Sequence, residues 1–165
     1  MDSLHLIEEA EEGPGLIQIW NIGKLNQALQ SLPQPKLEFC LAHDYGIVRR
    51  MTWCPFRSWQ SKEDSVEEDK LRQLGLLAIA CGDGSIRIFS IPNPALLQNN
   101  GRTTTVYRPT PEVTLVGHKI RRGKTSSCTS VAWSVKEGNY ILGGYGDGKF
   151  IYKPKIDIHF NILHF

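Results

Sequence analysis

The sequence predicts an all-β chain assembled from repeated units of short strands. Three observations carry this prediction: one turn-and-strand segment occurs three times, apolar runs of strand length precede two of the turns, and 15 Gly with 9 Pro supply many further turns. The chain has 165 residues, of which 41% are hydrophobic and 22% are charged. These values are typical of a globular domain and exclude a disordered chain.

The repeated segment occupies residues 13–20, 82–89 and 146–153. Its shared glycine stands at positions 15, 84 and 148, so the spacings are 69 and 64 residues. Glycine tolerates a positive φ, and the Asp-Gly pair of the second and third segments is among the strongest hairpin signals. β-branched and aromatic residues follow the turns, as strands prefer. Each segment therefore predicts a tight turn that leads into a strand.

The strands before the turns repeat as well. The runs at 76–81 and 140–145 are small and apolar, which predicts central strands buried on both faces. Farther upstream, residues 48–55 match residues 128–135, and a strand-like run that ends near a histidine precedes each of them. The match aligns pairs that lie two residues apart, and so on one sheet face, namely Met51 and Trp53 with Val131 and Trp133.

This order of strand, His, strand ending in Trp, strand, Gly-Asp-Gly turn and strand ending in an aromatic residue resembles the four-strand unit of WD-repeat β-propellers. The resemblance covers roughly residues 13–152 and implies a WD40-type β-propeller that is incomplete, with about two full blades and a partial one. A WD repeat takes about 40–45 residues, so these longer units imply insertions, which we place at 57–74 and 92–111. The alternative fold is an unrelated antiparallel sandwich of hairpins.

In WD repeats, the His, the turn Asp and the terminal Trp commonly join a hydrogen-bonded network within one blade. The resemblance assigns structural roles of this kind to His43 with Asp83, to His118 with Asp147, and to Trp20, Trp53 and Trp133. Phe89 stands where the second unit should have its Trp, and it has no N–H to donate, so that network is incomplete. A His and an Asp in register also resemble a catalytic dyad, but we expect them to be scaffold residues.

The remaining segments are expected to lie outside the repeated core. Residues 1–12 form an acidic N-terminal segment, and residues 153–165 form a divergent apolar tail. We expect 57–74 to be a solvated loop, with a short helix or an acidic docking segment as the alternative, and 92–111 to be an irregular connection.

Charge is divided unevenly along the chain. Through Asp83 there are 8 Lys+Arg against 13 Asp+Glu, and from Gly84 onward there are 11 against 4. The segment between the second histidine and its Trp is five residues longer than its counterpart, and the additional residues fall within 119–124, where four of six residues are basic. Such a loop suits phosphate or an acidic partner, and a solvated loop without a partner is the alternative. The candidate contact residues are Lys119, Arg121, Arg122 and Lys124, with Arg49 and Arg50 one unit earlier.

The sequence carries no enzyme or zinc motif that we recognise. It has no Walker loop, no Gly-x-Ser-x-Gly elbow and no His-Glu-x-x-His. We therefore expect no catalysis, no cofactor and no metal site. No apolar run reaches the roughly 18–20 residues of a membrane span, and residues 1–12 lack the positive charge of a secretory leader, so we expect an intracellular protein. The four cysteines lack CxxC spacing and read as buried free thiols, at Cys40, Cys54, Cys81 and Cys128.

Three stretches, 13–23, 44–55 and 74–84 with 89–92, together resemble the WD-repeat subunit of general transcription factor IIIC (polypeptide 2). The resemblance implies a non-catalytic scaffold in the nucleus, within a complex that recognises promoters of tRNA-type genes and recruits RNA polymerase III. It implies other subunits of that complex as partners, including a second propeller subunit, and promoter DNA through the complex. It implies no membrane and no small-molecule substrate. The alternative is a generic WD adaptor in another nuclear or cytoplasmic complex.

The third unit departs from the family pattern at its end. The register predicts a Trp at position 153, where Lys153 and Pro154 stand instead, and a Pro interrupts strand pairing. A closed propeller needs about 4–8 blades. We therefore expect a truncated isoform, an incomplete gene model or a fragment, with an evolved terminal cap as the alternative. Open blade faces should leave such a chain marginally stable or prone to aggregate.

Overall fold

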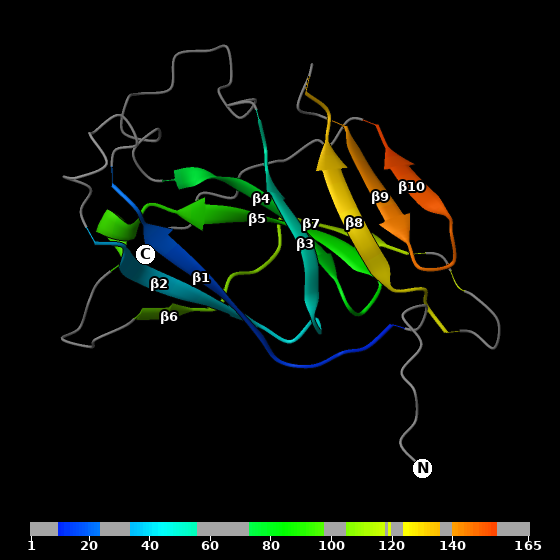
Figure 1. The fold of residues 1–165 in the computed structure, drawn as a ribbon, viewed down its shortest axis with the longest axis horizontal. Helices are drawn as coiled ribbons and strands as arrows, with labels where there is room; N and C mark the ends of the chain where they lie inside the picture. Colours follow the sequence, from blue (N-terminus) through cyan, green and yellow to red (C-terminus); the bar gives the residue numbers. More distant parts are fainter. Residues whose placement is uncertain are drawn as a thin grey trace.

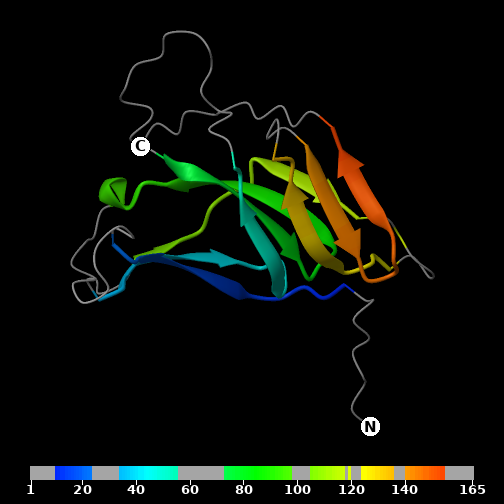
Figure 2. The ribbon, with the colours of Figure 1, turned by 45° about the horizontal axis from the view of Figure 1, so that its top comes forward.

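The computed structural model describes residues 10–23, 34–55, 73–97, 105–117, 119, 124–135 and 140–154. Within these ranges the chain forms three β-sheets and one short 3-10 turn, η2 (Pro94–Leu96), as Figures 1 and 2 show. The strands are β1 (Gly15–Asn21), β2 (Lys36–His43), β3 (Val48–Trp53), β4 (Gln73–Cys81), β5 (Ser85–Pro92), β6 (Thr105–Tyr107), β7 (Val113–Val116), β8 (Cys128–Trp133), β9 (Ile141–Tyr145) and β10 (Phe150–Lys153). The predicted all-β class is therefore confirmed.

The central sheet contains four strands in the order β3-β4-β5-β7. Neighbouring strands in it are antiparallel. The predicted central strand is confirmed, because residues 76–81 of β4 are all buried. Their two alternating rows of side chains point to opposite sides, so this sheet must be covered by another layer on each face.

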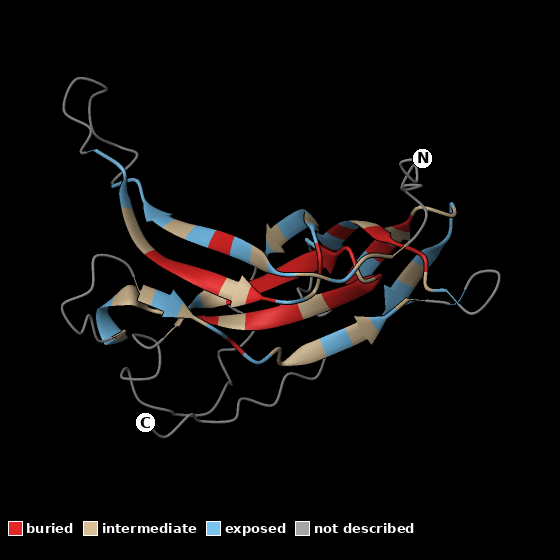
Figure 3. Cartoon of the chain, turned by 90° about the horizontal axis from the view of Figure 1, so that it is seen from below, coloured by how far each residue is buried: buried red, intermediate tan, exposed pale blue. Residues whose placement is uncertain are grey.

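The first and third sheets lie on the two sides of the central one. The first sheet has the order β1-β2-β6, and the third has the order β10-β9-β8. One apolar cluster joins the first sheet to the central sheet through Ile17, Phe39 and Leu41 against Leu77, Ile79 and Phe89. A second cluster joins the central sheet to the third through Ile86 and Ile88 against Val131, Trp133 and Ile141. Burial is accordingly concentrated in the middle of the stack, as Figure 3 shows.

The sequence repeat and the sheet are offset by one strand. Each sequence unit begins with the strand before its histidine, but that strand pairs with the unit before it. β2 pairs with β1, and β7 pairs with β5 rather than with β8. Each sequence unit therefore has its first strand in one sheet and its remaining strands in the next sheet. The chain connection within each unit thus links neighbouring sheets, as expected of an incomplete β-propeller.

One segment differs from its prediction. Residues 92–111 were expected to be irregular, and this is wrong for Thr105–Tyr107, which form β6. β6 follows the central strand β5 in sequence but belongs to the first sheet. It pairs there in parallel with β2, which places Phe39 opposite Thr105 and Leu41 opposite Tyr107. The β-branched and aromatic residues Thr-Val-Tyr favour a strand, but nothing local indicates which edge they join.

Two of the three predicted tight turns are confirmed. Gly84 and Gly148 have φ values of 82° and 81°, a region that favours glycine. A Cβ at Gly84 would also collide with the carbonyl of Ser126 from the adjacent sheet. The turn predicted at 13–15 is wrong: Gly13 forms an isolated bridge with Tyr45, and β1 begins at Gly15 without a hairpin before it. Two predicted boundaries shift: β4 begins at Gln73, inside the predicted insertion, and Lys153 ends β10. The rest of that insertion and residues 155–165 of the tail lie outside the described residues.

Candidate functional site

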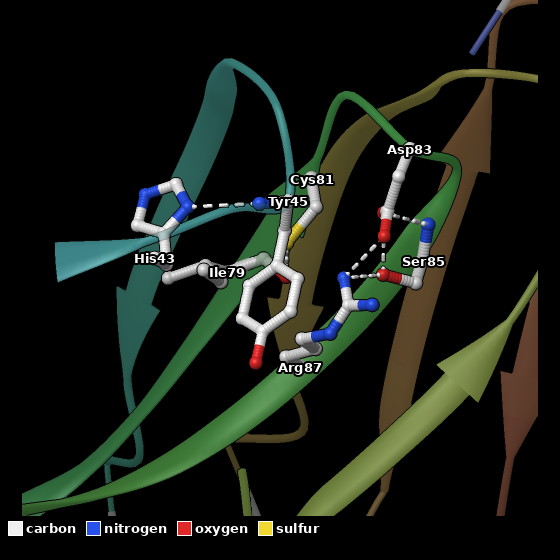
Figure 4. Close-up of polar contacts among 7 residues, drawn as sticks. All are labelled: His43, Tyr45, Ile79, Cys81, Asp83, Ser85 and Arg87. Carbon is white, nitrogen blue, oxygen red and sulfur yellow. Dashed lines mark hydrogen bonds and ion pairs between the residues drawn. The ribbon is translucent and has the colours of Figure 1, made fainter. Parts of the chain in front are cut away.

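The β4–β5 turn builds a cluster of polar and aromatic side chains, which we call the turn cluster: Asp83, Ser85, Arg87, Tyr45 and His43 (Figure 4). The Asp83 carboxylate accepts hydrogen bonds from the backbone N–H of Ser85 at 3.0 Å and from its hydroxyl at 2.6 Å. Asp side chains commonly cap a turn in this way. The cap holds the carboxylate beside the strand that follows.

Arg87 completes the charge pairing of this cluster. Its guanidinium lies 2.7 Å from the Asp83 carboxylate and donates to the Ser85 hydroxyl. It also lies over the ring of Tyr45, with Cζ 3.6 Å from the ring centroid, a favourable cation–π geometry. Ser85 and Arg87 alternate along β5, so their side chains share one face, and the turn brings the Asp83 carboxylate onto that face. The ion pair is largely buried, with side-chain exposures of 10% and 12%.

His43 extends the cluster at its other end. Its ring stacks on Tyr45 with centroids 5.6 Å apart, and its Nδ1 accepts a hydrogen bond from the Tyr45 N–H at 3.3 Å. The ring lies over Gly15, where any side chain would collide with it. His43 is buried, and its Nε2 has no hydrogen-bond partner among the described residues. Because Nδ1 is an acceptor, this arrangement fits a neutral imidazole.

The structure gives His43 and Asp83 different partners from the predicted ones. No hydrogen bond joins them among the described contacts, and they are linked instead through Tyr45 and Arg87. The physical reason is that the Arg87 guanidinium lies beside the Asp83 carboxylate and pairs with it. The Asp83 carboxylate also accepts two hydrogen bonds from Ser85. We call this set of contacts among Asp83, Ser85 and Arg87 the brace, and its geometry is structural rather than that of a His–Asp catalytic dyad. His118 lies outside the described residues.

Burial lowers the pKa of His43, and the nearby Asp44 carboxylate opposes that shift. The unfolded chain binds a proton near its ordinary pKa of about 6.5, whereas the folded chain binds it only at lower pH. We therefore expect stability to fall as pH drops below about 6.5, by at most about 1.4 kcal/mol per pH unit for one proton. Urea unfolding between pH 5 and pH 8 measures this slope. His43→Gln should reduce it, and an unchanged slope in that variant would contradict the assignment.

The second turn repeats the cap but not the brace. Asp147 accepts a hydrogen bond from the Lys149 N–H at 3.3 Å, and its carboxylate lies 3.5 Å from the Lys149 ammonium. Lys149 is exposed, unlike Arg87. The Asp147 N–H also donates to the hydroxyl of Ser126 at 3.3 Å. The two Gly-Asp-Gly turns therefore share their local geometry and differ in the burial of their cation.

The three Trp residues to which the sequence assigned structural roles do not share one environment. Trp133 is buried, and its indole N–H donates to the Thr52 carbonyl at 3.2 Å, which joins β8 to β3. Trp53, its counterpart one unit earlier, is exposed, as is Trp20. Trp53 is exposed because the first sheet, in the part of the chain that the structure describes, has no strand that lies against β3 as β3 lies against β8.

Some of the predicted basic contact residues gather at one rim of the stack. The Nε of Arg49 donates to the Ser127 hydroxyl at 2.9 Å, which places β3 beside the end of the basic loop. Lys119 pairs with Thr125 in an isolated antiparallel bridge, so the two ends of the loop are pinned together. Lys119 and Lys124 are exposed, whereas Arg121 and Arg122 lie outside the described residues. Arg50 and Arg49 line an open depression with Ser130, Ala132, Leu142 and Phe150.

The cysteines are free thiols, and three of them are buried. Burial raises the pKa of Cys128 to about 11, so its sulfur is a packing group at neutral pH rather than a nucleophile. Within the described residues, no group of three or more His, Cys, Asp or Glu side chains could hold a metal ion. The same part of the chain contains no helix long and apolar enough to cross a membrane.

Sequence reasoning missed Arg87 and Tyr45 as members of the turn cluster. Ser85 and Arg87 directly after the Asp83-Gly84 turn were a usable signal, because a strand places these two side chains on one face. No comparable signal was available for Tyr45, since its position over the guanidinium depends on how β2 and β5 are brought together across the sheets.

Comparison with known proteins gives two kinds of relative. General transcription factor 3C polypeptide 2 from Homo sapiens and from Pongo abelii is 30% identical to this chain over 92% of its residues. Transcription factor tau subunit sfc6 from Schizosaccharomyces pombe is 36% identical over 48% of the chain. The chain matches no protein-family model. It spans 18% of the length of the first relatives and 11% of the third.

Proposed function

Because this chain is a homologue of general transcription factor 3C polypeptide 2, we propose that it is a non-catalytic scaffold subunit of transcription factor IIIC. In this proposal it acts in the nucleus, in promoter recognition and RNA polymerase III transcription of tRNA-type genes. Its partners are the other subunits of the complex, including a second propeller subunit, and promoter DNA through the complex. The observation that carries the proposal is the similarity along 92% of the chain.

The geometry of the described residues supports a scaffold role. The conspicuous polar cluster is a brace: Asp83, Ser85 and Arg87 satisfy one another, and Tyr45 covers the cation. Groups engaged in this way hold neighbouring segments of the chain together. The sheets instead present faces and rims, which are the surfaces that a subunit uses to contact other proteins.

Affinity purification from nuclear extract tests the proposal. The full chain, tagged at one end, should co-purify with the other transcription factor IIIC subunits, identified by mass spectrometry. A variant with the brace removed by Asp83→Ala serves as a misfolding control and should lose them. Recovery of subunits of a different complex would favour a generic WD adaptor, and absence of the transcription factor IIIC subunits from the intact chain would contradict the proposal.

The basic loop at residues 119–124, which we call the basic rim, supplies a specific prediction about DNA. Replacing Lys119, Arg121, Arg122 and Lys124 with Ala should flatten the salt dependence of DNA binding by the assembled complex. Each phosphate contact that is lost should reduce the slope of log K against log salt by about 0.9. The measurement is a salt titration of binding to promoter duplex.

A matched control comes from the acidic part of the chain. Lys36 is exposed on the first sheet, remote in sequence from the basic rim, so Lys36→Ala should leave the slope unchanged. An unchanged slope in the fourfold variant would contradict phosphate contact by this loop.

A further inference from the structure

An extended segment at residues 10–13, which we call the strap, crosses the ends of the sheets before the chain enters β1. In Figure 1 it runs in blue beneath the lower ends of β8 and β3. The N–H of Ala10 donates to the Thr125 carbonyl at 3.2 Å, just before the third sheet. The N–H of Glu11 donates to the Gly82 carbonyl at 2.8 Å, just after β4 of the central sheet. Backbone hydrogen bonds therefore hold the strap on two sheets that are distant from it in sequence.

The surface under the strap is shaped to receive it. A side chain at Gly82 would collide with the Glu11 carbonyl and with the backbone of Ile47. Gly82 does not have a positive φ, so its own backbone conformation does not require glycine, and the space needed by its neighbours does. At the other end of the strap, the Gly13 carbonyl accepts a hydrogen bond from the Gly46 N–H at 2.8 Å. The strap thus follows a defined path across the ends of the sheets.

This path brings negative charge to the base of the basic rim. Thr125, whose carbonyl accepts the hydrogen bond from Ala10, also forms the bridge that closes the rim. Lys124 directly precedes Thr125, whereas Glu11 and the exposed Glu12 directly follow Ala10. Acidic and basic residues therefore flank one hydrogen bond on its two sides. Charges placed so close together attract one another, and salt weakens the attraction with a screening length of about 8 Å.

We propose that the strap competes with nucleic acid for the basic rim and is displaced when DNA binds. The inference rests on the DNA contact of the proposed function and states how that contact is regulated. Glutamate carboxylates and DNA phosphates are both anions that pair with Lys and Arg side chains. The strap lowers the positive potential of the rim while it is in place. A duplex, with one negative charge per roughly 1.7 Å of its axis, is the stronger competitor for the same cations.

Two variants of the full chain weaken the competitor by different routes. Glu11→Gln with Glu12→Gln removes the negative charge of the strap and keeps its backbone hydrogen bonds. Ala10→Pro removes the N–H that donates to Thr125 and leaves the net charge unchanged. Circular dichroism checks folding, and the charge variant keeps the test decisive if Ala10→Pro does not fold.

The matched control is Glu38→Gln with Asp44→Asn. It removes the same number of negative charges from the first half of the chain, at residues whose cation partners, Lys36 and Arg108, lie outside the basic rim. An effect of net charge alone would appear equally in this control and in the strap variant.

Fluorescence anisotropy of a short labelled DNA duplex gives the affinities. At low salt, Glu11→Gln with Glu12→Gln should bind about 3- to 10-fold more tightly than the unchanged chain, the range for two surface charge pairs. This gain should shrink as salt rises. Ala10→Pro should also bind more tightly than the unchanged chain, and the control should stay within about twofold of it.

Hydrogen exchange of the unchanged chain tests the displacement itself. The amides of Ala10 and Glu11 should exchange faster when the duplex is bound than when it is absent. Equal gains in the strap variant and the control, no gain in a folded Ala10→Pro, unchanged exchange on DNA binding, or no DNA binding by any of these chains would each overturn the proposal. None of these outcomes alters co-purification with transcription factor IIIC subunits. Failure of co-purification would leave the competition intact, because the duplex assay uses this chain alone.

Discussion

Replacing Asp83 with Ala is expected to reduce the free energy of unfolding by about 3–5 kcal/mol. The substitution leaves Arg87 without its carboxylate in a largely buried position, and it removes the cap from the Ser85 N–H and hydroxyl. Removing one partner of a buried ion pair leaves an uncompensated charge, which costs more than the pair itself contributes. Urea unfolding of the variant and of the unchanged chain measures the difference.

The second turn provides the matched control for Asp83. Asp147 occupies the same place in the same Gly-Asp-Gly motif, but its cation partner Lys149 is exposed. Asp147→Ala should therefore cost at most about 1 kcal/mol, the range of surface ion pairs. A double-mutant cycle on Asp83 and Arg87 isolates the pair. Equal losses for the two Asp variants would contradict the account of the brace.

Replacing Phe89 with Ala is expected to cost about 3–5 kcal/mol, the usual range for a buried Phe. Phe89 lies in the apolar cluster that joins the first sheet to the central one, and its ring is also 6.4 Å from that of Tyr45. The substitution therefore opens a cavity between two sheets and removes one wall of the turn cluster. Thermal and urea unfolding of the variant measure the loss.

Trp20 is the control for Phe89, because the repeat places the two residues at one position of the unit. Trp20 is exposed, and its indole N–H donates to the neighbouring Gln18 side chain at 3.1 Å. Trp20→Ala should therefore change the free energy of unfolding by no more than about 0.5 kcal/mol. A loss as large as that of Phe89→Ala would contradict the exposed position of Trp20.

Much of the fold could be predicted because its signals are local. The Asp83-Gly84 turn, the buried run in β4 and the strands on either side follow from turn chemistry and residue type, and all are confirmed. The strand-by-strand resemblance to WD repeats supplied the order. β6 could not be predicted, since a three-residue strand has too little pattern to identify its partner, and its pairing with β2 is set by the stack.

The sequence predicted two members of the turn cluster but not the contacts that they make. His43 and Asp83 were identified by their recurrence in register, and both are buried or nearly so in one cluster. The sequence does not show which cation pairs with Asp83, because this depends on the positions of the side chains in the folded chain. The cation is Arg87, two residues beyond Ser85 on the same strand. The His43 ring stacks on Tyr45 instead of contacting Asp83.

The parallel strand β6 has a consequence for the order in which the chain folds. Its partner residues Phe39 and Thr105 are 66 positions apart in sequence, whereas the β4–β5 hairpin closes over a few residues. Closing a long loop costs entropy before its contacts repay it. We therefore expect β6 to join late in folding, after the first and central sheets have met, and its amides to exchange with solvent earliest among the strands. The pairing of β6 with β2 would then be a late folding step, completed after the first and central sheets have packed together.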